Sequence, residues 1–307
     1  MAVITLARQV GSGGQTIAQL LAERLGYRVV GRRDLAAAAA NRGLQMPPVF
    51  AEFADEQRLA LSRTADTSPL YFGFGELEYG DALRGAGPVS GRGPISVLEA
   101  VAQERRTLLL AVASLTYALA AEDGLILIGG GGQYLLGGLP SVLSVKIVAP
   151  AEVRAERLAS AYGLDRVAAR EAVLSGDREQ REYNRALFDA DWDDPLHWNL
   201  IVNSEAIDPE RARDVILAAF GSDGTAPRVP AETTNMLELA SAVNQALGDD
   251  AFGNAWLLAT ATAEGIVLHG DTTDSEQARA ALDVAQRLGA GRRVVSDLMV
   301  QGRQYVG

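Results

Sequence analysis

Apolar residues recur along the chain with two spacings, and together these predict an alternation of strands and helices. Short, fully apolar runs are typical of buried parallel strands, and the segments between them show the spacing of helices. The predicted strands of the first part are 3–6, 27–30, 125–128, 142–148 and 200–203. The predicted helices are one that opens at the glycine turn 11–14 and others over 35–41, 51–64, 95–121, 151–162, 167–175, 177–187 and 209–220. This order predicts an α/β fold with a parallel sheet and helices on both faces.

The pattern changes after residue 221. Residues 222–234 have the composition of a linker. The elements predicted beyond it are a helix over 236–247, strands over 256–262 and 266–269, a helix over 275–288 and a strand over 294–300. This αββαβ order predicts a small α+β domain over 235–307, next to an α/β domain over 1–221. A length of 307 residues fits two domains.

The segment between the second and third strands contains signals of irregular structure. Pro47 and Pro48 are expected to break a helix. Residues 68–94 are rich in glycine and proline, with aromatic residues interspersed. A loop of this length is typical of a mobile flap, which we favour over a plain linker.

A glycine turn, Gly11 to Gly14, joins the first strand to the first helix. Such a turn can aim consecutive backbone N–H groups at one anion, and the helix N-terminus adds partial positive charge. In the P-loop signature Gly-x-x-x-x-Gly-Lys-Ser/Thr, Arg8 holds the first glycine position and Gly14 the lysine position. A second cluster, 129–132, also follows a strand, so both clusters are expected to border one crevice. An ordinary βα turn stays open as the alternative at Gly11 to Gly14.

Composition narrows the class of protein. The absence of cysteine excludes disulfides, Cys-ligated zinc and thiol nucleophiles, and two histidines make a multi-histidine metal site unexpected. A net charge of −11 argues against general nucleic-acid binding.

No apolar run approaches the ~20 residues of a membrane span. The N-terminus lacks the pattern of a signal peptide, so we expect a cytoplasmic protein. A homo-oligomer is compatible with the sequence.

The basic residues are almost all arginines. Lys146 is the only lysine, and the other 27 of the 28 basic residues are arginines. Arginine must therefore provide nearly all positive charge, including any that neutralises phosphate. Its planar guanidinium can hold phosphate oxygens in pairs.

Four stretches, by their order and spacing, resemble the cytidylate kinase-like family of P-loop nucleoside monophosphate kinases over 1–221. They are ITLARQVGSGGQTIAQLLAERLG, LILIGGGGQYLL, VKIVAPAEVRAERL and SGDREQREYNRALFDADWDDPLHWNLIVNSE. The last 70 or so residues are similar to a BON domain, through element order and the stretch GIVLHGDTTDSEQARAALDVAQRL. The ligand of that domain is unknown.

The first resemblance implies phosphoryl transfer from ATP, with Mg²⁺, to a nucleoside monophosphate such as CMP or dCMP. Such transfer depends on positioning and on cations around the phosphoryl group. The residues implied to bind the donor phosphates are Gly11, Ser12, Gly13, Gly14, Gln15 and Thr16. The hydroxyl of Thr16 or Ser12 is the implied contact of the protein with Mg²⁺.

The family's lid stretch, D-R-x-x-R, matches Asp177, Arg178 and Arg181. The match implies phosphate contacts for the two arginines and a contact of the aspartate with the acceptor sugar. Arg154 and Arg157 form a second pair with the same spacing and fit the border of the lid. The alternative for each pair is a solvated helix face with salt bridges. The acids available for such bridges are Glu152, Glu156 and Glu182.

The chain departs from the family pattern around the expected phosphates. Arg32 matches the arginine of an Asp-Arg pair on the acceptor side, but Gly31 replaces the aspartate. Gly130 stands where the family has an arginine, and Gln15 where relatives carry a basic residue. Arg8 is the best candidate for a substitute cation, and we predict a catalytic role for it.

These departures leave two further hypotheses open beside a kinase. The chain could be a non-catalytic nucleotide sensor that signals through the BON-like domain, or that domain could itself be the functional half. From Thr234 on there are nine acids and five arginines, which argues against an anionic membrane as its target. Trp192 and Trp198, with His197, are expected to pack the connection between the lid and the last strand, with base stacking as the alternative.

Overall fold

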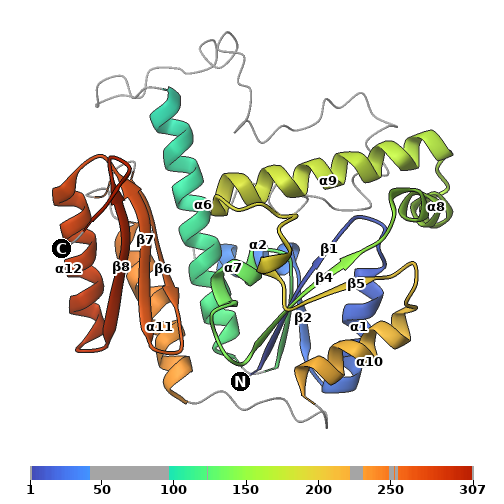
Figure 1. Cartoon of the computed structure of the whole chain (residues 1–307), viewed down its shortest axis with the longest axis horizontal. Coiled ribbons are helices and arrows are strands. Elements are labelled where there is room, and N and C mark those ends of the chain that lie inside the picture. The colour runs from blue at the N-terminus through green and yellow to red at the C-terminus, as the bar shows by residue number, and fades with distance from the viewer. Residues whose placement is uncertain are drawn as a thin grey trace.

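The first part of the chain forms a five-stranded parallel sheet in the order β2-β3-β1-β4-β5. Figure 1 shows the computed structural model, which describes residues 2–41, 97–122, 124–221, 231–248, 252 and 255–305. The strands are β1 (Val3–Arg8), β2 (Arg28–Val30), β3 (Leu125–Ile128), β4 (Val142–Val148) and β5 (Leu200–Asn203). All five predicted strands are confirmed within two residues. Their carboxyl ends meet at one edge of the sheet, because the strands are parallel.

One face of this sheet is covered by α1 (Gly14–Leu25) and α10 (Pro209–Phe220). Ile4 and Leu6 of β1 point to this face and pack with Ile17 of α1 and Ile216 of α10. The Asp208 side chain accepts a hydrogen bond from the Arg211 backbone N–H and so caps α10.

The opposite face is covered by α6 (Val97–Ala120) and its neighbours. These are α2 (Arg32–Asn41), α7 (Gly132–Leu136), α8 (Ala151–Tyr162) and α9 (Arg166–Phe188). The sequence predicts two helices where α9 is continuous, and that prediction is wrong. Gly176 lies buried inside α9, and a glycine in a helix interior costs only about 1 kcal/mol, which the packing of α9 outweighs.

The last part of the chain forms a second, mixed sheet in the order β6-β7-β8-β9. Its elements are α11 (Ala231–Leu247), β6 (Trp256–Ala261), β7 (Gly265–Thr272), α12 (Ser275–Gly289), β8 (Arg293–Val300) and β9 (Arg303–Gln304). The predicted αββαβ order is confirmed, with β9 as an addition. Helix α11 begins inside the segment expected to be a linker.

Helix α6 stands between the two sheets, and one hydrophobic core extends from the first sheet to the second. The Tyr117 hydroxyl donates to the Ala259 carbonyl oxygen on the edge strand β6 (3.2 Å). Asn244 of α11 pairs with the same residue through two hydrogen bonds of 2.8 Å. The hydroxyls of Ser114 and Ser241 lie 2.8 Å apart across α6 and α11. The second sheet is therefore attached to the first through α6.

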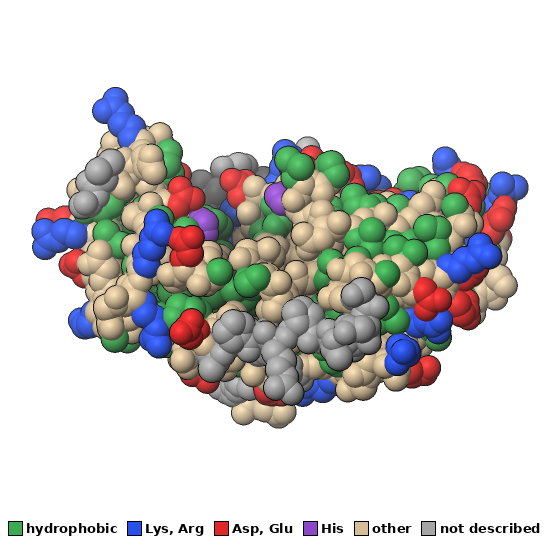
Figure 2. Space-filling model, turned by 60° about the horizontal axis from the view of Figure 1, so that its bottom comes forward, with side chains coloured by type: hydrophobic (Ala, Val, Ile, Leu, Met, Phe, Trp, Pro, Cys, Tyr) green, Lys and Arg blue, Asp and Glu red, His purple; other side chains and the backbone are tan. Residues whose placement is uncertain are grey.

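The predicted helix 51–64, the prolines at 47 and 48 and the predicted flap 68–94 lie outside the described residues. No helix in the described ranges is both long and apolar enough to cross a membrane. On the face shown in Figure 2, acidic and basic side chains are interspersed over the described surface.

Candidate phosphate loop and arginine cavity

The loop after β1 has the backbone geometry of a phosphate cradle. Gly11 and Gly13 both have φ of 76°, a left-handed conformation that favours glycine. Gly13 caps α1, and a Cβ built there would meet no atom of the described residues within 4 Å, so this point of the loop is open on the described side. The N–H groups of the first turn of α1 have no partner within the helix. They can therefore donate to an anion that binds beside Gly13.

Beneath the loop lies Arg154 of α8, which is 3% exposed. A Cβ at Gly11 would lie 2.6 Å from the Arg154 carbonyl oxygen, so the loop lies directly on the backbone of this residue. The Arg154 guanidinium forms a two-pronged pair with the Asp177 carboxylate of α9, at 2.8 and 2.9 Å. It also donates to the carbonyl oxygens of Ala149 and Val10, at 2.8 and 3.4 Å. This arginine ties α8, α9 and the loop together.

Arg157 supports the loop by a second route. Its guanidinium donates to the Ser204 hydroxyl at 2.9 Å and to the Ser204 carbonyl oxygen at 2.8 Å. The Ser204 hydroxyl in turn donates to the Ser12 carbonyl oxygen at 2.7 Å. Arg154 and Arg157 thus both fix the loop from below.

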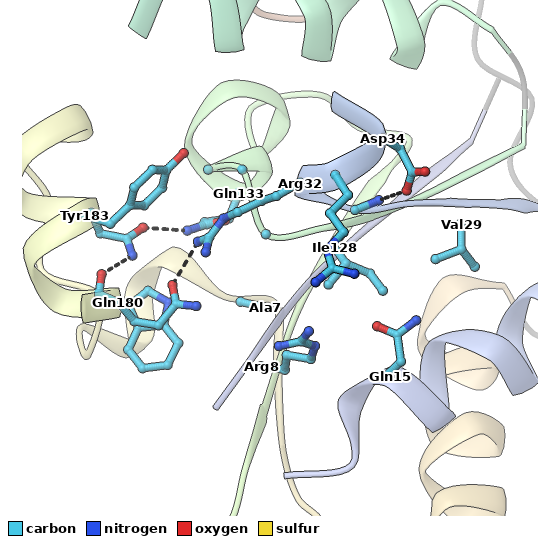
Figure 3. A pocket seen from close by; sticks show the side chains of 17 residues that line it. Ala7, Arg8, Gln15, Val29, Arg32, Asp34, Ile128, Gln133, Gln180 and Tyr183 are labelled. Atoms are coloured by element: carbon cyan, nitrogen blue, oxygen red, sulfur yellow. Dashed lines mark hydrogen bonds between the residues drawn. The ribbon is translucent and has the colours of Figure 1, made fainter. Parts of the chain in front are cut away.

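Above the carboxyl ends of the strands lies a cavity of about 300 Å³, which we call the arginine cavity (Figure 3). It is bounded by the end of β1, the start of α1, the β2–α2 turn, the end of β3 and the buried face of α9. Its lining residues are Ala7, Arg8, Gln15, Val29, Gly31, Arg32, Arg33, Asp34, Ile128, Gly129, Gly130, Gly131, Gln133, Gln180, Tyr183, Asn184 and Trp192.

Arg32 crosses this cavity from α2 to α9. Its guanidinium donates to the Gln180 Oε1 at 3.1 Å and lies over the Tyr183 ring, 4.6 Å from the ring centroid. Burial lowers the pKa of Arg32, and the charge of Arg8 lowers it further. Burial also raises the pKa of Tyr183 to about 12. Arg32 keeps its charge at neutral pH, since arginine is effectively always protonated in proteins.

The polar side chains on the α9 wall of the cavity are held by hydrogen bonds. Asn184 donates to the Gln180 carbonyl oxygen at 2.6 Å, and Gln133 of α7 donates to the Asn184 Oδ1 at 3.4 Å. Asp34 accepts from the Gly31 backbone N–H at 2.7 Å, which closes the first turn of α2. Amides and guanidinium groups are most of the polar side chains in the lining, and such donors suit phosphate and a polar heterocycle.

A charged cluster holds Trp192 against the edge of the cavity. Lys146 donates to the Trp192 carbonyl oxygen at 2.7 Å and to Asp193 at 3.1 Å, and its Nζ lies 3.8 Å from the Trp192 ring centroid. Arg181 of α9 donates to the other oxygen of Asp193 at 2.7 Å. Trp192 and Trp198 pack with Ala7, as expected for a packed connection.

The residues predicted from sequence, apart from Thr16 in the first turn of α1, fall into three groups. Arg8, Gln15 and Arg32 line the arginine cavity, and Arg178 and Arg181 lie on the exposed side of α9. Those beneath or within the loop are Gly11, Ser12, Gly13, Gly14, Arg154, Arg157 and Asp177. The structure therefore brings Arg8 and Arg32 together at one cavity and places the other predicted arginines, Arg154, Arg157, Arg178 and Arg181, outside its lining.

Four lining residues were not predicted from the sequence: Gln133, Gln180, Tyr183 and Asn184. A signal was present for the last three, since they share one face of α9 with the buried Leu187. Polar residues on an otherwise apolar helix face mark either a buried network or a site. That pattern is readable from sequence once α9 is treated as one helix.

The side chains that could contact Mg²⁺ are few. Thr16 is exposed in the first turn of α1, whereas Ser12 is buried and its hydroxyl has no hydrogen-bond partner in the described structure. The described residues contain no cluster of three or more histidine, aspartate or glutamate side chains arranged for a metal ion. Mg²⁺ in nucleotide sites commonly keeps several waters and is held mainly by the nucleotide phosphates. A single hydroxyl such as that of Thr16 is therefore compatible with such a site.

A parallel sheet in this order, with a glycine loop between β1 and α1, is the fold of P-loop kinases. The model of the cytidylate kinase-like family matches residues 3–206, so the chain belongs to this family. The match ends before the second sheet.

Comparisons with individual proteins give weaker likenesses. An uncharacterized protein from Eubacterium ventriosum has 16% identity and a TM-score of 0.46, with 71% of this chain and 97% of that one covered. Shikimate kinase from Acinetobacter baumannii has 13% identity and a TM-score of 0.34, with coverages of 71% and 92%. A uronate isomerase of Corynebacterium glutamicum is 28% identical over 101 residues, 33% of this chain. The chain spans only 20% of the length of that isomerase.

Proposed function

We propose that this protein transfers a phosphoryl group from Mg-ATP to a nucleoside monophosphate, of which CMP and dCMP are the first candidates. The observation that carries the proposal is the open, left-handed Gly13 at the start of α1, next to a cavity lined by Arg8 and Arg32. The loop suits the donor phosphates, because its N–H groups and the helix dipole favour an anion.

The acceptor would occupy the arginine cavity. Arg32 can place its guanidinium on the acceptor phosphate, and the amides of Gln133, Gln180 and Asn184 can bond the edge of a base. A pyrimidine offers both donors and acceptors at its edge, and amide side chains can serve either role. Arg178 and Arg181 would then add charge at the transferred phosphoryl, with Arg181 exchanging Asp193 for a phosphate oxygen.

Mg²⁺ would be held between Thr16 and the donor phosphates, and when bound it neutralises charge on them. The loop N–H groups orient the donor, and the arginines stabilise charge that develops at the transferred group. Gln180 and Tyr183 keep Arg32 aimed across the cavity, so the acceptor meets a cation whose position is already fixed.

The test is turnover of Mg-ATP with a panel of nucleoside monophosphates, CMP and dCMP included. We expect turnover with at least one acceptor and a loss of at least about 100-fold in Arg178→Ala/Arg181→Ala. The matched control is Arg166→Ala/Arg170→Ala, which removes two exposed arginines of the same helix that pair with Glu152. No turnover with any acceptor, or equal losses in both double variants, would contradict the proposal.

A second candidate, a non-catalytic nucleotide sensor, draws on the position of α6. This helix contacts α2 and α9, which carry cavity residues, and also α11 and β6 of the second sheet. A structural change at the cavity could therefore reach the second sheet through the contacts of α6. We propose that the domain containing this sheet acts as a BON-like output domain. Clear binding of Mg-ADP by calorimetry without turnover would favour this candidate.

A further inference from the structure

The phosphate loop differs from the standard P-loop signature at three positions, 8, 14 and 15, and the first two of these face each other in space. Arg8 stands at the first glycine position and Gly14 at the lysine position. A Cβ built at Gly14 would lie 2.6 Å from the Arg8 Cβ and 3.1 Å from its Cδ. The aliphatic part of the Arg8 side chain therefore passes across the bare α-carbon of Gly14. Only one of the two positions can carry a long side chain.

The backbone gives no reason for a glycine at position 14. Gly14 begins α1 and does not have a positive φ, unlike Gly11 and Gly13. A glycine within a helix is less favourable than an alanine, and Gly14 has no left-handed conformation that would call for a glycine. The contact with Arg8 is the structural feature that accounts for it.

The head group of Arg8 is positioned to meet an anion. Its Nε is buried and has no hydrogen-bond partner among the described residues, and the side chain lines the arginine cavity beside Gln15. Figure 3 shows Arg8 and Gln15 pointing into the same space. Among the lining residues that the structure describes, Asp34 is the only acid, and it accepts a hydrogen bond from the Gly31 N–H. Two like charges, Arg8 and Arg32, at one cavity favour an anion between them.

We propose that the P-loop cation has changed its position in this chain, which we call the exchange. Arg8, at the end of β1, supplies the cation in place of a lysine at position 14. Position 14 is a glycine because a larger residue there would collide with the Arg8 side chain. The exchange rests on the proposed function, because it assigns Arg8 to the donor phosphates of that site. Arginine suits a position at the end of β1, since its guanidinium group can donate to two phosphate oxygens at once. A lysine at position 14 and an arginine at position 8 exclude each other.

Calorimetric titration with Mg-ADP tests the exchange without depending on turnover. The variants are Arg8→Ala, Arg8→Gly, Gly14→Ala and the swap Arg8→Gly/Gly14→Lys, each checked for unchanged folding by its urea midpoint. We expect Arg8→Ala and Arg8→Gly to weaken binding about ten- to a hundredfold, the scale of a lost hydrogen bond to a charged group. Gly14→Ala should also weaken binding, although it removes no charge. The swap should bind at least tenfold more tightly than Arg8→Gly alone, on the same scale.

The matched control is Arg24→Ala, which removes an exposed arginine from the other end of α1. Wild-type affinity in Arg8→Ala, or a swap that binds no better than Arg8→Gly, overturns the exchange. Absence of Mg-ADP binding to the unmodified protein overturns it as well. Binding without turnover contradicts the kinase but leaves the exchange supported. Turnover that Arg8→Ala leaves unchanged supports the kinase and contradicts the exchange.

Discussion

The regions below and above the phosphate loop are both rich in arginine, yet they use it in opposite ways. Below the loop, Arg154 and Arg157 direct their donors to Asp177, Ser204 and backbone carbonyls. Above it, Arg8 and Arg32 face a cavity. The charge of an arginine therefore does not reveal its role. What differs is the surroundings of the guanidinium: Arg154 is buried against a carboxylate and backbone carbonyls, whereas Arg8 and Arg32 line a cavity, with Arg32 also bonded to Gln180.

The largest expected effect is on stability, from a change below the loop. Arg154→Ala leaves the Asp177 carboxylate buried without its partner, which should lower the free energy of unfolding by about 3–5 kcal/mol. Urea denaturation measures this. The matched control is Arg170→Ala, whose pairing with Glu152 is exposed and should contribute little to stability. Similar losses in both variants would remove the distinction between the two regions.

A cavity-wall glycine should give the next largest effect. Gly131 has φ of 78°, and a Cβ there would lie 2.0 Å from the Phe188 Cζ. Gly131→Ala should therefore cost about 1–3 kcal/mol from overpacking, in addition to backbone strain. Gly13→Ala, with a similar φ but open space, should show the strain alone. Thermal unfolding of both variants, and of Gly131→Ala/Phe188→Leu, checks this; a smaller loss at Gly131 than at Gly13 would contradict it.

Removal of a cavity arginine should leave stability almost unchanged. Arg32→Met keeps the apolar stem of the side chain and removes a partly buried cation, so we expect a change within about 1 kcal/mol in urea unfolding. The KM for the acceptor should rise about tenfold or more, because a charge-assisted bond to its phosphate is lost. A KM that stays the same while unfolding shifts strongly would assign Arg32 to support rather than to binding.

The smallest effect concerns pH and the cluster beside Trp192. Burial acts to raise the pKa of Asp193, but hydrogen bonds from Arg181 and Lys146 outweigh it, and the pKa lies below its ordinary value. The ionised group thus stabilises the folded state above pH ~4, and this contribution is lost as the pH falls through the lowered pKa. Asp193 is 45% exposed, so the contribution should stay below about 1 kcal/mol.

A urea series for Asp193→Asn and the unmodified protein checks the sign. The two midpoints should differ most near pH 7 and converge below pH ~4. A difference that grows as the pH falls would contradict the assignment.

Much of the fold follows from local patterns. The strands β1, β3 and β4 and the capped helix α10 are readable from apolar runs and from the Asp208-Pro209 start. The continuity of α9 through Gly176 is not readable, because its burial against neighbouring helices outweighs a local helix-breaking signal. The shared core around α6 depends on contacts between segments more than 100 residues apart, such as Tyr117 with Ala259.

The site was predictable only in part, for a related reason. Sequence placed Arg8 near a phosphate loop, since it directly precedes the glycine turn. It could not separate Arg154 from Arg178, because both belong to pairs with the same helical spacing. What separates them is Asp177, which lies 23 residues from Arg154 along the chain and 2.8 Å from it in space. Spacing within one helix carries no information about such a partner.

The most direct test of the account is a crystal structure of the unmodified protein with Mg-ADP and CMP. We expect the diphosphate on the backbone of Gly11 to Gly14 with the Arg8 guanidinium in contact with it, and CMP in the arginine cavity. The pair between Arg154 and Asp177 should be unchanged beneath the loop. A nucleotide bound elsewhere, or Arg154 released from Asp177 to contact phosphate, would contradict the division of the arginines into support and site.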